Sequence, residues 1–226
     1  MKRHILTLLV LLLFLPGWGN AQNKAEEAIA SNSRGIELLK EGKTNEAITE
    51  FQKAVQLDPN YVPARQNLGH AYDRQGRSEE AMAQYRKAAE LDPKSSVVYN
   101  NLGVLYDKKG LYDEAIGEFE KALQINPGDA TALKNLETAK KNKAVIEERK
   151  KAIAQAQQAV EANPKDPRAA YNLARLYAFH GQKEQAIEWV AKALKLGYKD
   201  IEYLKVDPAL KSLRDDSNFI RLFPTR

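Results

Sequence analysis

A short phrase of an apolar residue, Asp or Asn, and Pro returns in this chain at a fixed interval of 34 residues. It reads AVQLDPNYVPA from Ala54, AAELDPKSSVV from Ala88 and ALQINPGDATA from Ala122. Self-similarity at a period of this length is typical of proteins that stack copies of one small supersecondary unit. The period therefore constrains the fold more than the composition does.

Three units of 34 residues align without gaps and open at Ala28, Val62 and Ser96. Counting places from these residues, glycine holds the eighth and fifteenth places, alanine the twentieth and twenty-seventh, and an aromatic ring the twenty-fourth. The residues at these five places are Gly35, Gly69 and Gly103; Gly42, Gly76 and Gly110; Ala47, Ala81 and Ala115; Ala54, Ala88 and Ala122; and Phe51, Tyr85 and Phe119.

The size of these residues predicts two packed helices in each unit. Apolar residues recur at helical spacing, as in Ala81, Tyr85 and Ala88, which share one helix face. The glycine at the fifteenth place can adopt the left-handed conformation that ends a helix. The proline that closes each unit disfavours helical conformation in the residue before it, so the second helix ends there.

This pattern resembles the tetratricopeptide repeat. The segments NLGHAYDRQGRSEEAMAQYRKAAELDP and NLGVLYDKKGLYDEAIGEFEKALQINP reproduce the signature of that family almost place for place. The resemblance implies an all-α, right-handed superhelical solenoid of antiparallel helix pairs with a concave inner groove. We assign residues 22–199 to the repeat array, with repeats at 28–61, 62–95 and 96–129, an irregular unit at 130–166 and a last unit at 167–199.

The period slips in the irregular unit, where no glycine stands at the expected turn. Alanines typical of a second helix return three residues late, at Ala152, Ala156 and Ala159. The pattern favours one long helix from Asp129 to about Ala162, and a hairpin with a lengthened first helix is the alternative. Residues 200–226 differ from the repeats, and we interpret them as a small helical cap that covers the last apolar face.

The first 21 residues have the layout of a secretory signal peptide. Lys2 and Arg3 precede an apolar run from Ile5 to Leu15, and small residues lead to a predicted cleavage site after Ala21. The run is shorter than the roughly 20 residues of a membrane-spanning helix. We therefore expect export to the bacterial periplasm, and the alternative is an uncleaved helix that anchors the chain in the inner membrane.

The remaining sequence offers little for catalysis. The chain has no cysteine, which excludes disulfides and thiol chemistry. Without residues 1–21 it carries 33 basic and 30 acidic residues, a formal charge of +3, which gives no argument for nucleic-acid binding. The histidines show no metal-ligand spacing, and nucleotide or hydrolase motifs are absent. We predict a protein that is not an enzyme and that has no cofactor and no metal.

The resemblance places the second, fifth, ninth and twelfth places of each first helix on the inner groove. An asparagine occupies the neighbouring sixth place in four units, and side-chain amides can hydrogen-bond the backbone of an extended peptide. The alternative is that these asparagines serve helix packing. The predicted partner-binding residues are Gln66, Asn67, His70, Asp73, Asn100, Asn101, Val104, Asp107, Lys134, Asn135, Tyr171, Asn172 and Arg175.

Two functions follow from these observations. The first is a scaffold or adaptor of the cell envelope that binds another protein or an extended peptide in the groove. The second is a structural subunit of an envelope assembly that docks through its convex face or through a basic segment, residues 140–151. That segment is suited to weak contact with an anionic membrane or cell-wall polymer. Its basic residues are Lys140, Lys141, Lys143, Arg149, Lys150 and Lys151.

Overall fold

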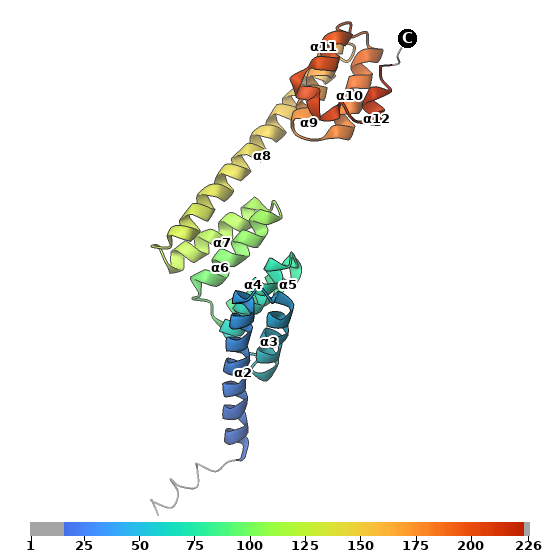
Figure 1. Ribbon diagram of the computed structural model, residues 1–226. Coiled ribbons are helices and arrows are strands. Elements are labelled where there is room, and N and C mark those ends of the chain that lie inside the picture. Colours follow the sequence, from blue (N-terminus) through green and yellow to red (C-terminus); the bar gives the residue numbers. More distant parts are fainter. Residues whose placement is uncertain (1–15, 224–226) are drawn as a thin grey trace, which may run out of the picture. The chain divides into compact units, whose positions relative to one another are not determined.

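The computed structural model describes residues 16–223, and this part of the chain is helical with no strand. The expected fold, an all-α solenoid of antiparallel helix pairs, is confirmed (Figure 1). Most of the predicted signal segment lies outside the described residues. None of the described helices is both long and apolar enough to span a membrane.

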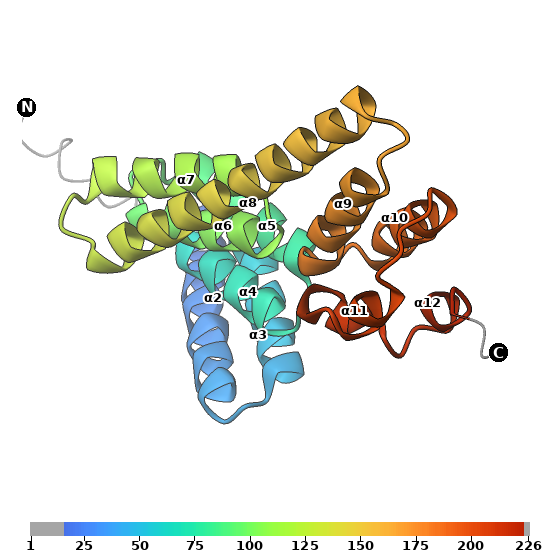
Figure 2. The same ribbon diagram turned by 90° about the horizontal axis from the view of Figure 1, so that it is seen from above.

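The described chain divides into two compact units, and the boundary falls between Lys141 and Asn142. Unit 1 contains the helix pairs α2–α3, α4–α5 and α6–α7, which pack as antiparallel neighbours (Figures 1 and 2). Their bounds are α2 Pro16–Lys40, α3 Thr44–Leu57, α4 Val62–Arg74, α5 Ser78–Leu91, α6 Ser96–Lys108 and α7 Tyr112–Ile125. Helix α2 starts 12 residues before Ala28, so it is longer than the other first helices.

Helix α8, Ala130–Ala162, is one continuous helix of 33 residues, so the irregular unit is not a hairpin. Its first part belongs to unit 1 and the rest to unit 2. Unit 2 continues with α9 Pro167–Phe179, α10 Lys183–Lys195, α11 Ile201–Val206, the 3₁₀ helix η1 Pro208–Leu213, and α12 Ser217–Ile220. These last three short helices form the predicted cap, because Leu204, Leu210, Leu213 and Phe219 join the core of α9 and α10.

The turn between the helices of each pair is set by glycine. Gly76 and Gly110 both have a φ of 73°, in the left-handed region that other residues rarely adopt. In each case the glycine N–H closes the preceding helix, as in the bond from Gly76 to the carbonyl of Asp73 at 2.9 Å. The predicted role of the fifteenth place is confirmed.

The repeated Asp-Pro phrase also ends helices as predicted, and the aspartate has an additional role. Asp58 follows α3 in an extended conformation, with a φ of −132°, directly before Pro59. Its carboxylate accepts a hydrogen bond from the backbone N–H of Asn60 at 2.9 Å, and Asp92 does the same for Lys94 at 3.1 Å. The carboxylate thus holds the turn that leads into the next pair.

The cores of unit 1 are made by close contact between the glycine of one helix and the ring of its partner. A Cβ atom added at Gly103 would lie 2.5 Å from Cε1 of Phe119, and one added at Gly69 would lie 3.0 Å from the same atom of Tyr85. Both rings are buried. Glycine at the eighth place is therefore required by the ring at the twenty-fourth place.

Candidate partner-binding surface

The first helices of unit 1 align so that side chains at adjacent places of successive repeats touch. Asn67 donates a hydrogen bond to Oδ1 of Asn32 at 2.8 Å, and Asn135 donates one to Oδ1 of Asn100 at 3.0 Å. Both bonds join residues 35 positions apart, from the sixth place of one repeat to the fifth place of the repeat before it. The first bond joins α4 to α2, the second joins the start of α8 to α6, and an ion pair between Lys108 and Asp73 joins α6 to α4. The predicted groove residues of unit 1 therefore form one continuous strip along α4, α6 and the start of α8, which we call the inner strip.

The asparagines of the inner strip hold the repeats together. Besides the two bonds above, Asn101 hydrogen-bonds the hydroxyl of Tyr85. Burial raises the pKa of that hydroxyl well above its usual range, the Asp73 carboxylate adds to the rise, and the bond with Asn101 acts against it. This is the packing role that the sequence left as an alternative. Each amide still has hydrogen-bonding capacity beyond the bond it makes here.

Other members of the inner strip are also engaged within the unit. Gln66 donates to the hydroxyl of Ser95 at 3.0 Å, and the ammonium of Lys108 lies 2.7 Å from the Asp73 carboxylate. Val104 and Asp107 are half-buried, and Val104 packs against the cluster around Phe119. His70 and Lys134 are exposed. These two residues are the members of the strip that a partner would reach most directly.

In unit 2 the structure departs from the predicted groove at Tyr171. The Tyr171 side chain is only 4% exposed, because the C-terminal cap covers it. Its hydroxyl hydrogen-bonds the carboxylate of Asp207, which is fully buried, and burial together with that bond raises the pKa of Tyr171 well above its usual range. Tyr171 therefore belongs to the core and does not face a partner.

Asp207 also contacts a second predicted groove residue. Nε of Arg175 lies 2.8 Å from Oδ2 of Asp207, although the angle is not that of a hydrogen bond. The other carboxylate oxygen accepts the backbone N–H of Ala209 at 2.9 Å. We call this set of contacts the Asp207 latch, because it fixes η1 against α9. The sequence predicted a cap but not this buried carboxylate.

Asn172 and Arg175 line an open recess on α9, together with three residues that the sequence analysis missed. The recess has a volume of about 460 Å³, and the additional residues are Leu176, Phe179 and Ala209. Phe179 is 75% exposed. The sequence held a signal for it, since Phe179 occupies the thirteenth place, where α4 and α6 carry Arg74 and Lys108.

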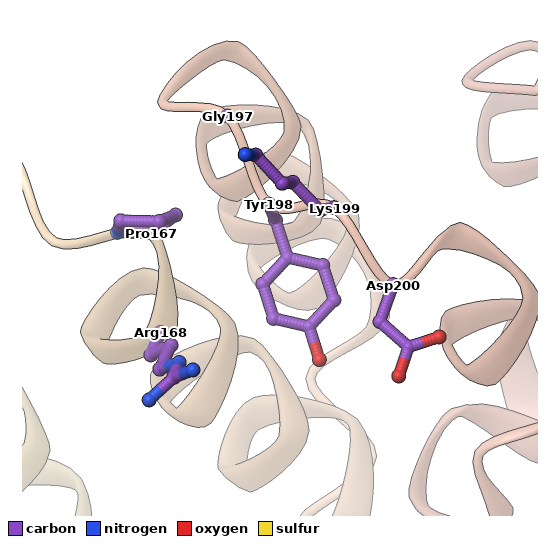
Figure 3. A pocket seen from close by; sticks show the side chains of 6 residues that line it. All are labelled: Pro167, Arg168, Gly197, Tyr198, Lys199 and Asp200. Atoms are coloured by element: carbon purple, nitrogen blue, oxygen red, sulfur yellow. The ribbon is translucent and has the colours of Figure 1, made fainter.

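A second recess of about 380 Å³ lies between the start of α9 and the segment that follows α10 (Figure 3). Arg168, Lys199 and Asp200 line it, so charges of both signs are present. Figure 3 shows the Tyr198 ring between Arg168 and Asp200. The Tyr198 ring also packs against the Tyr171 ring, with a centroid distance of 4.4 Å. Burial, and then the Asp200 carboxylate, raise the pKa of Tyr198. Asp200 itself caps α11.

The basic segment of α8 is partly neutralised by neighbouring carboxylates. Lys140 lies 3.0 Å from Glu120, and Lys150 lies 3.1 Å from Glu147. Arg149 is half-buried. Burial of His180 lowers the pKa of that imidazole, and the charge of Arg149 is the second cause of the lowering. Lys141 and Lys151 are exposed. Among residues 16–223 we find no cluster of three or more side chains that could hold a metal ion.

Comparison with known proteins assigns the family. A model described as tetratricopeptide repeat matches residues 38–102 and 147–206, and a second model with the same description matches residues 96–129. Together with the helix pairs and the glycine–ring contacts, these matches show the class of protein: the chain belongs to the tetratricopeptide repeat family.

The individual relatives match only part of the chain or at low identity. The chloroplastic tetratricopeptide repeat domain-containing protein PYG7 of Arabidopsis thaliana is 42% identical over 43 residues, which cover 19% of this chain and 14% of that protein. The second TPR domain of human RPAP3, solved in complex with the HSP70 peptide SGPTIEEVD, is similar over 52% of this chain and 98% of that domain, with 28% identity and a TM-score of 0.50.

A longer match is found with the crystal structure of MamA protein. It covers 79% of this chain and 96% of that one, with 25% identity and a TM-score of 0.50. The fold similarity thus extends beyond the three regular repeats.

Proposed function

We propose that this protein is a non-catalytic scaffold that binds a partner polypeptide along the inner strip. The observation that carries the proposal is the alignment of α4 with α6 through the Asp73–Lys108 ion pair and of α6 with the start of α8 through Asn100 and Asn135. This alignment brings amide, imidazole and ammonium groups into one row. A row of this kind can hydrogen-bond the backbone of an extended segment. The human RPAP3 domain, which is similar in fold at 28% identity, binds a peptide.

We further propose that the protein acts in the bacterial cell envelope, in the periplasm. Support comes from the sequence of residues 1–21, with its basic start, short apolar run and small residues before Ala21. Cell fractionation tests this location. Recovery with the periplasmic fraction as a chain shortened by 21 residues is the expected result, and recovery of the full-length chain with the membranes would instead support the anchored alternative.

The binding test uses the exposed members of the inner strip. Replacement of Asn67 or Asn135 by Ala would disturb repeat packing as well as binding, since both residues bond across repeats. We therefore place a photo-crosslinking amino acid at His70 or at Lys134. The matched controls are Lys53 of α3 and Lys87 of α5, which are exposed at equivalent places of two second helices.

We expect the same partner polypeptide to be crosslinked from His70 and from Lys134. Crosslinking of that polypeptide should be weak or absent at the two control positions. A charge reversal at Lys134, compared with the same change at Lys53, should weaken partner binding about threefold to tenfold. Equal crosslinking from first and second helices would contradict partner binding along the inner strip. It would then favour docking through the convex face.

A further inference from the structure

Helix α8 stands where the other repeats have a helix pair, and each part of it leaves uncovered the face that such a pair buries (Figure 1). We propose that two copies of this chain associate through antiparallel α8 helices, so that the first part of each α8 packs against the last part of the other. The exchange makes the missing pair of the irregular unit from two chains. It goes beyond the proposed function, because the occupant is a second copy of this chain rather than a polypeptide bound along the inner strip.

The part of α8 that belongs to unit 1 is covered on one side. Leu136 and Ala139 are buried in the core of unit 1. On another side of the same turns, Leu133 is 48% exposed, and Glu137 and Lys141 are exposed. These three residues are four positions apart, so they share one face of the helix. Glu137 holds the eighth place, which the second helix covers in each regular repeat.

The part of α8 that belongs to unit 2 is also covered on one side. Ile153 and Val160 pack in the core that includes α9 and α10. Ala159 corresponds to the twenty-seventh place once the slip of three residues is allowed for, and the alanines at that place are fully buried in the regular repeats. Ala159 is exposed, as is Glu148 on the same face, and Val145 beside them is 50% exposed. This part of α8 therefore has the uncovered face of a second helix that lacks its first helix.

The two uncovered faces cannot cover each other within one chain. They lie on successive turns of one continuous helix, which rises about 1.5 Å per residue, whereas a pair requires the chain to reverse its direction. A second α8 that runs antiparallel supplies this reversal. The same face of each copy then packs against itself across a two-fold axis, as in most symmetric dimers.

Charge and position favour one register for the two helices. Ala144 stands at the fifteenth place, where the regular repeats turn, so we place the axis at the midpoint between Ala144 and Val145. Lys141 and Glu148 lie at equal distances on either side of this midpoint. Each exposed Lys141 therefore faces the exposed Glu148 of the second copy. The two residues are not neighbours within one helix, where side chains three or four positions apart meet.

The same register matches the remaining side chains of the face. Leu133 falls opposite Ala156 of the second copy, and Val145 lies beside the axis. Association removes Leu133 and Val145, each about half exposed, from water, which is favourable in proportion to the apolar area covered. Glu137 falls beside Lys151 of the second copy. Opposite charges therefore meet at a second point of the interface.

Sedimentation equilibrium of the chain as recovered from cells tests the association. We expect a dimer that dissociates on dilution, with a Kd of about 10 μM or below. The charge reversal Lys141→Glu sets two carboxylates opposite each other on both sides of the axis, and it should weaken the dimer at least about tenfold. Glu148→Lys should do the same. Combining the two changes remakes each pair with reversed signs and should return the Kd to within about threefold of the original value.

The matched control is Lys53→Glu in α3, which changes the net charge equally at an exposed position outside α8. It should leave the Kd unchanged. The double reversal also separates contacts between copies from contacts within one helix. In a single helix, a glutamate at 141 lies four residues from Glu137 and a lysine at 148 lies three from Lys151, so each reversal adds a like-charge neighbour there. Recovery of the dimer in the double variant is therefore specific to pairing between two chains.

Single cysteines test the direction of the helices and the position of the axis. The chain has no cysteine, so Ala144→Cys supplies one thiol in each copy, close to the axis. We expect this variant to form a disulfide-linked dimer on mild oxidation. Gln158→Cys, at another exposed position of α8, is the control. Its two copies lie about 40 Å apart along antiparallel helices and should stay unlinked.

The proposal is wrong if the chain sediments as a monomer at all concentrations, if Lys141→Glu has no effect, or if the double reversal does not restore the dimer. It is also wrong if Gln158→Cys is linked as readily as Ala144→Cys, which would indicate parallel helices. Crosslinking from His70, which lies on α4, tests the proposed function separately.

Discussion

The regular repeats of unit 1 and the last repeat of unit 2 bring their paired helices together in different ways. In unit 1 a glycine at the eighth place lies under an aromatic ring, as Gly103 does under Phe119. In α9 and α10 the same two places hold Ala174 and Val190, and both are fully buried. A larger residue on one helix is matched by a smaller one on the other, so the pair conserves volume rather than residue type.

Helix α8 has neither form of this pair, and no hairpin is made there. Its eighth place is Glu137, which is exposed, and Ala156 stands at the twenty-fourth place once the slip of three residues is allowed for. The turn position is occupied by Ala144, a strong helix former, where the other repeats have glycine. With no close-contact pair and no turn residue, the helix continues to Ala162.

Packing between one pair and the next is nevertheless preserved in both units. Gln52 donates to the Tyr72 hydroxyl at 2.8 Å in unit 1, and Gln157 donates to the Tyr177 hydroxyl at 2.9 Å in unit 2. Both bonds span 20 residues. The hydrogen bond between the second-helix part of one repeat and the first helix of the next repeat is therefore kept despite the slip of three residues. Packing between two helices of the irregular repeat is lost, because α8 is a single helix.

The largest expected effect concerns the ring of the glycine–ring pair. Phe119→Ala should lower the free energy of unfolding by about 3–5 kcal/mol, because a large buried side chain leaves a cavity. Val190→Ala removes fewer atoms, and we expect a loss of about 2 kcal/mol. Urea denaturation followed by circular dichroism measures both values. Equal losses would contradict the view that unit 1 depends on the larger member of the pair.

An intermediate effect is expected from exchanging one type of pair for the other. Gly103→Ala should destabilise by about 1–2 kcal/mol, since the new Cβ meets a buried ring. When Phe119→Val is added, the combined loss should be smaller than the sum of the two single losses by about 1 kcal/mol, because the pair then resembles Ala174 and Val190.

The control for this exchange is Gly117→Ala in α7. A Cβ added at Gly117 meets nothing within 4 Å. The change should therefore stabilise the protein by about 0.5–1 kcal/mol, as expected for alanine in a helix. If Gly103→Ala stabilised the protein as Gly117→Ala does, close approach would not be the reason for glycine at the eighth place.

The smallest expected effect tests whether α8 is continuous at the missing turn. Ala144→Gly should destabilise by up to about 1 kcal/mol, and Ala154→Gly, at another exposed position of α8, should do the same. The free energy of unfolding in urea is again the measurement. A neutral or stabilising Ala144→Gly beside a destabilising Ala154→Gly would indicate a turn at residue 144 and a hairpin in solution.

Much of unit 1 could be predicted because the residues that form and end each helix lie within the repeat itself. Gly76 ends α4 by its own left-handed conformation, and Pro93 ends α5 by restricting the backbone of Asp92 before it. The spacing of Ala81, Tyr85 and Ala88 is a property of the helix itself. These features need no knowledge of distant residues, so the helix pairs and their order followed from the pattern.

The candidate sites were harder to predict because they depend on what lies opposite each side chain. The periodic pattern placed Tyr171 in a groove, but the cap covers it through Asp207, 36 residues further on. The pattern also could not tell whether Asn67 binds a ligand or Asn32. Phe179 was visible only as an apolar residue at a place where the three regular repeats carry cations, Lys40, Arg74 and Lys108.

The sequence alone determined the helix pairs, their turns and their family, because a 34-residue period with glycine, alanine and ring positions admits one way of packing neighbouring helices. The tertiary structure decided that the irregular unit is a single helix, that the asparagines bond between repeats, and that the cap covers Tyr171 while leaving Phe179 exposed. The physical reason is that burial and hydrogen-bond partners are properties of two segments in contact, and a repeat pattern describes only one segment at a time.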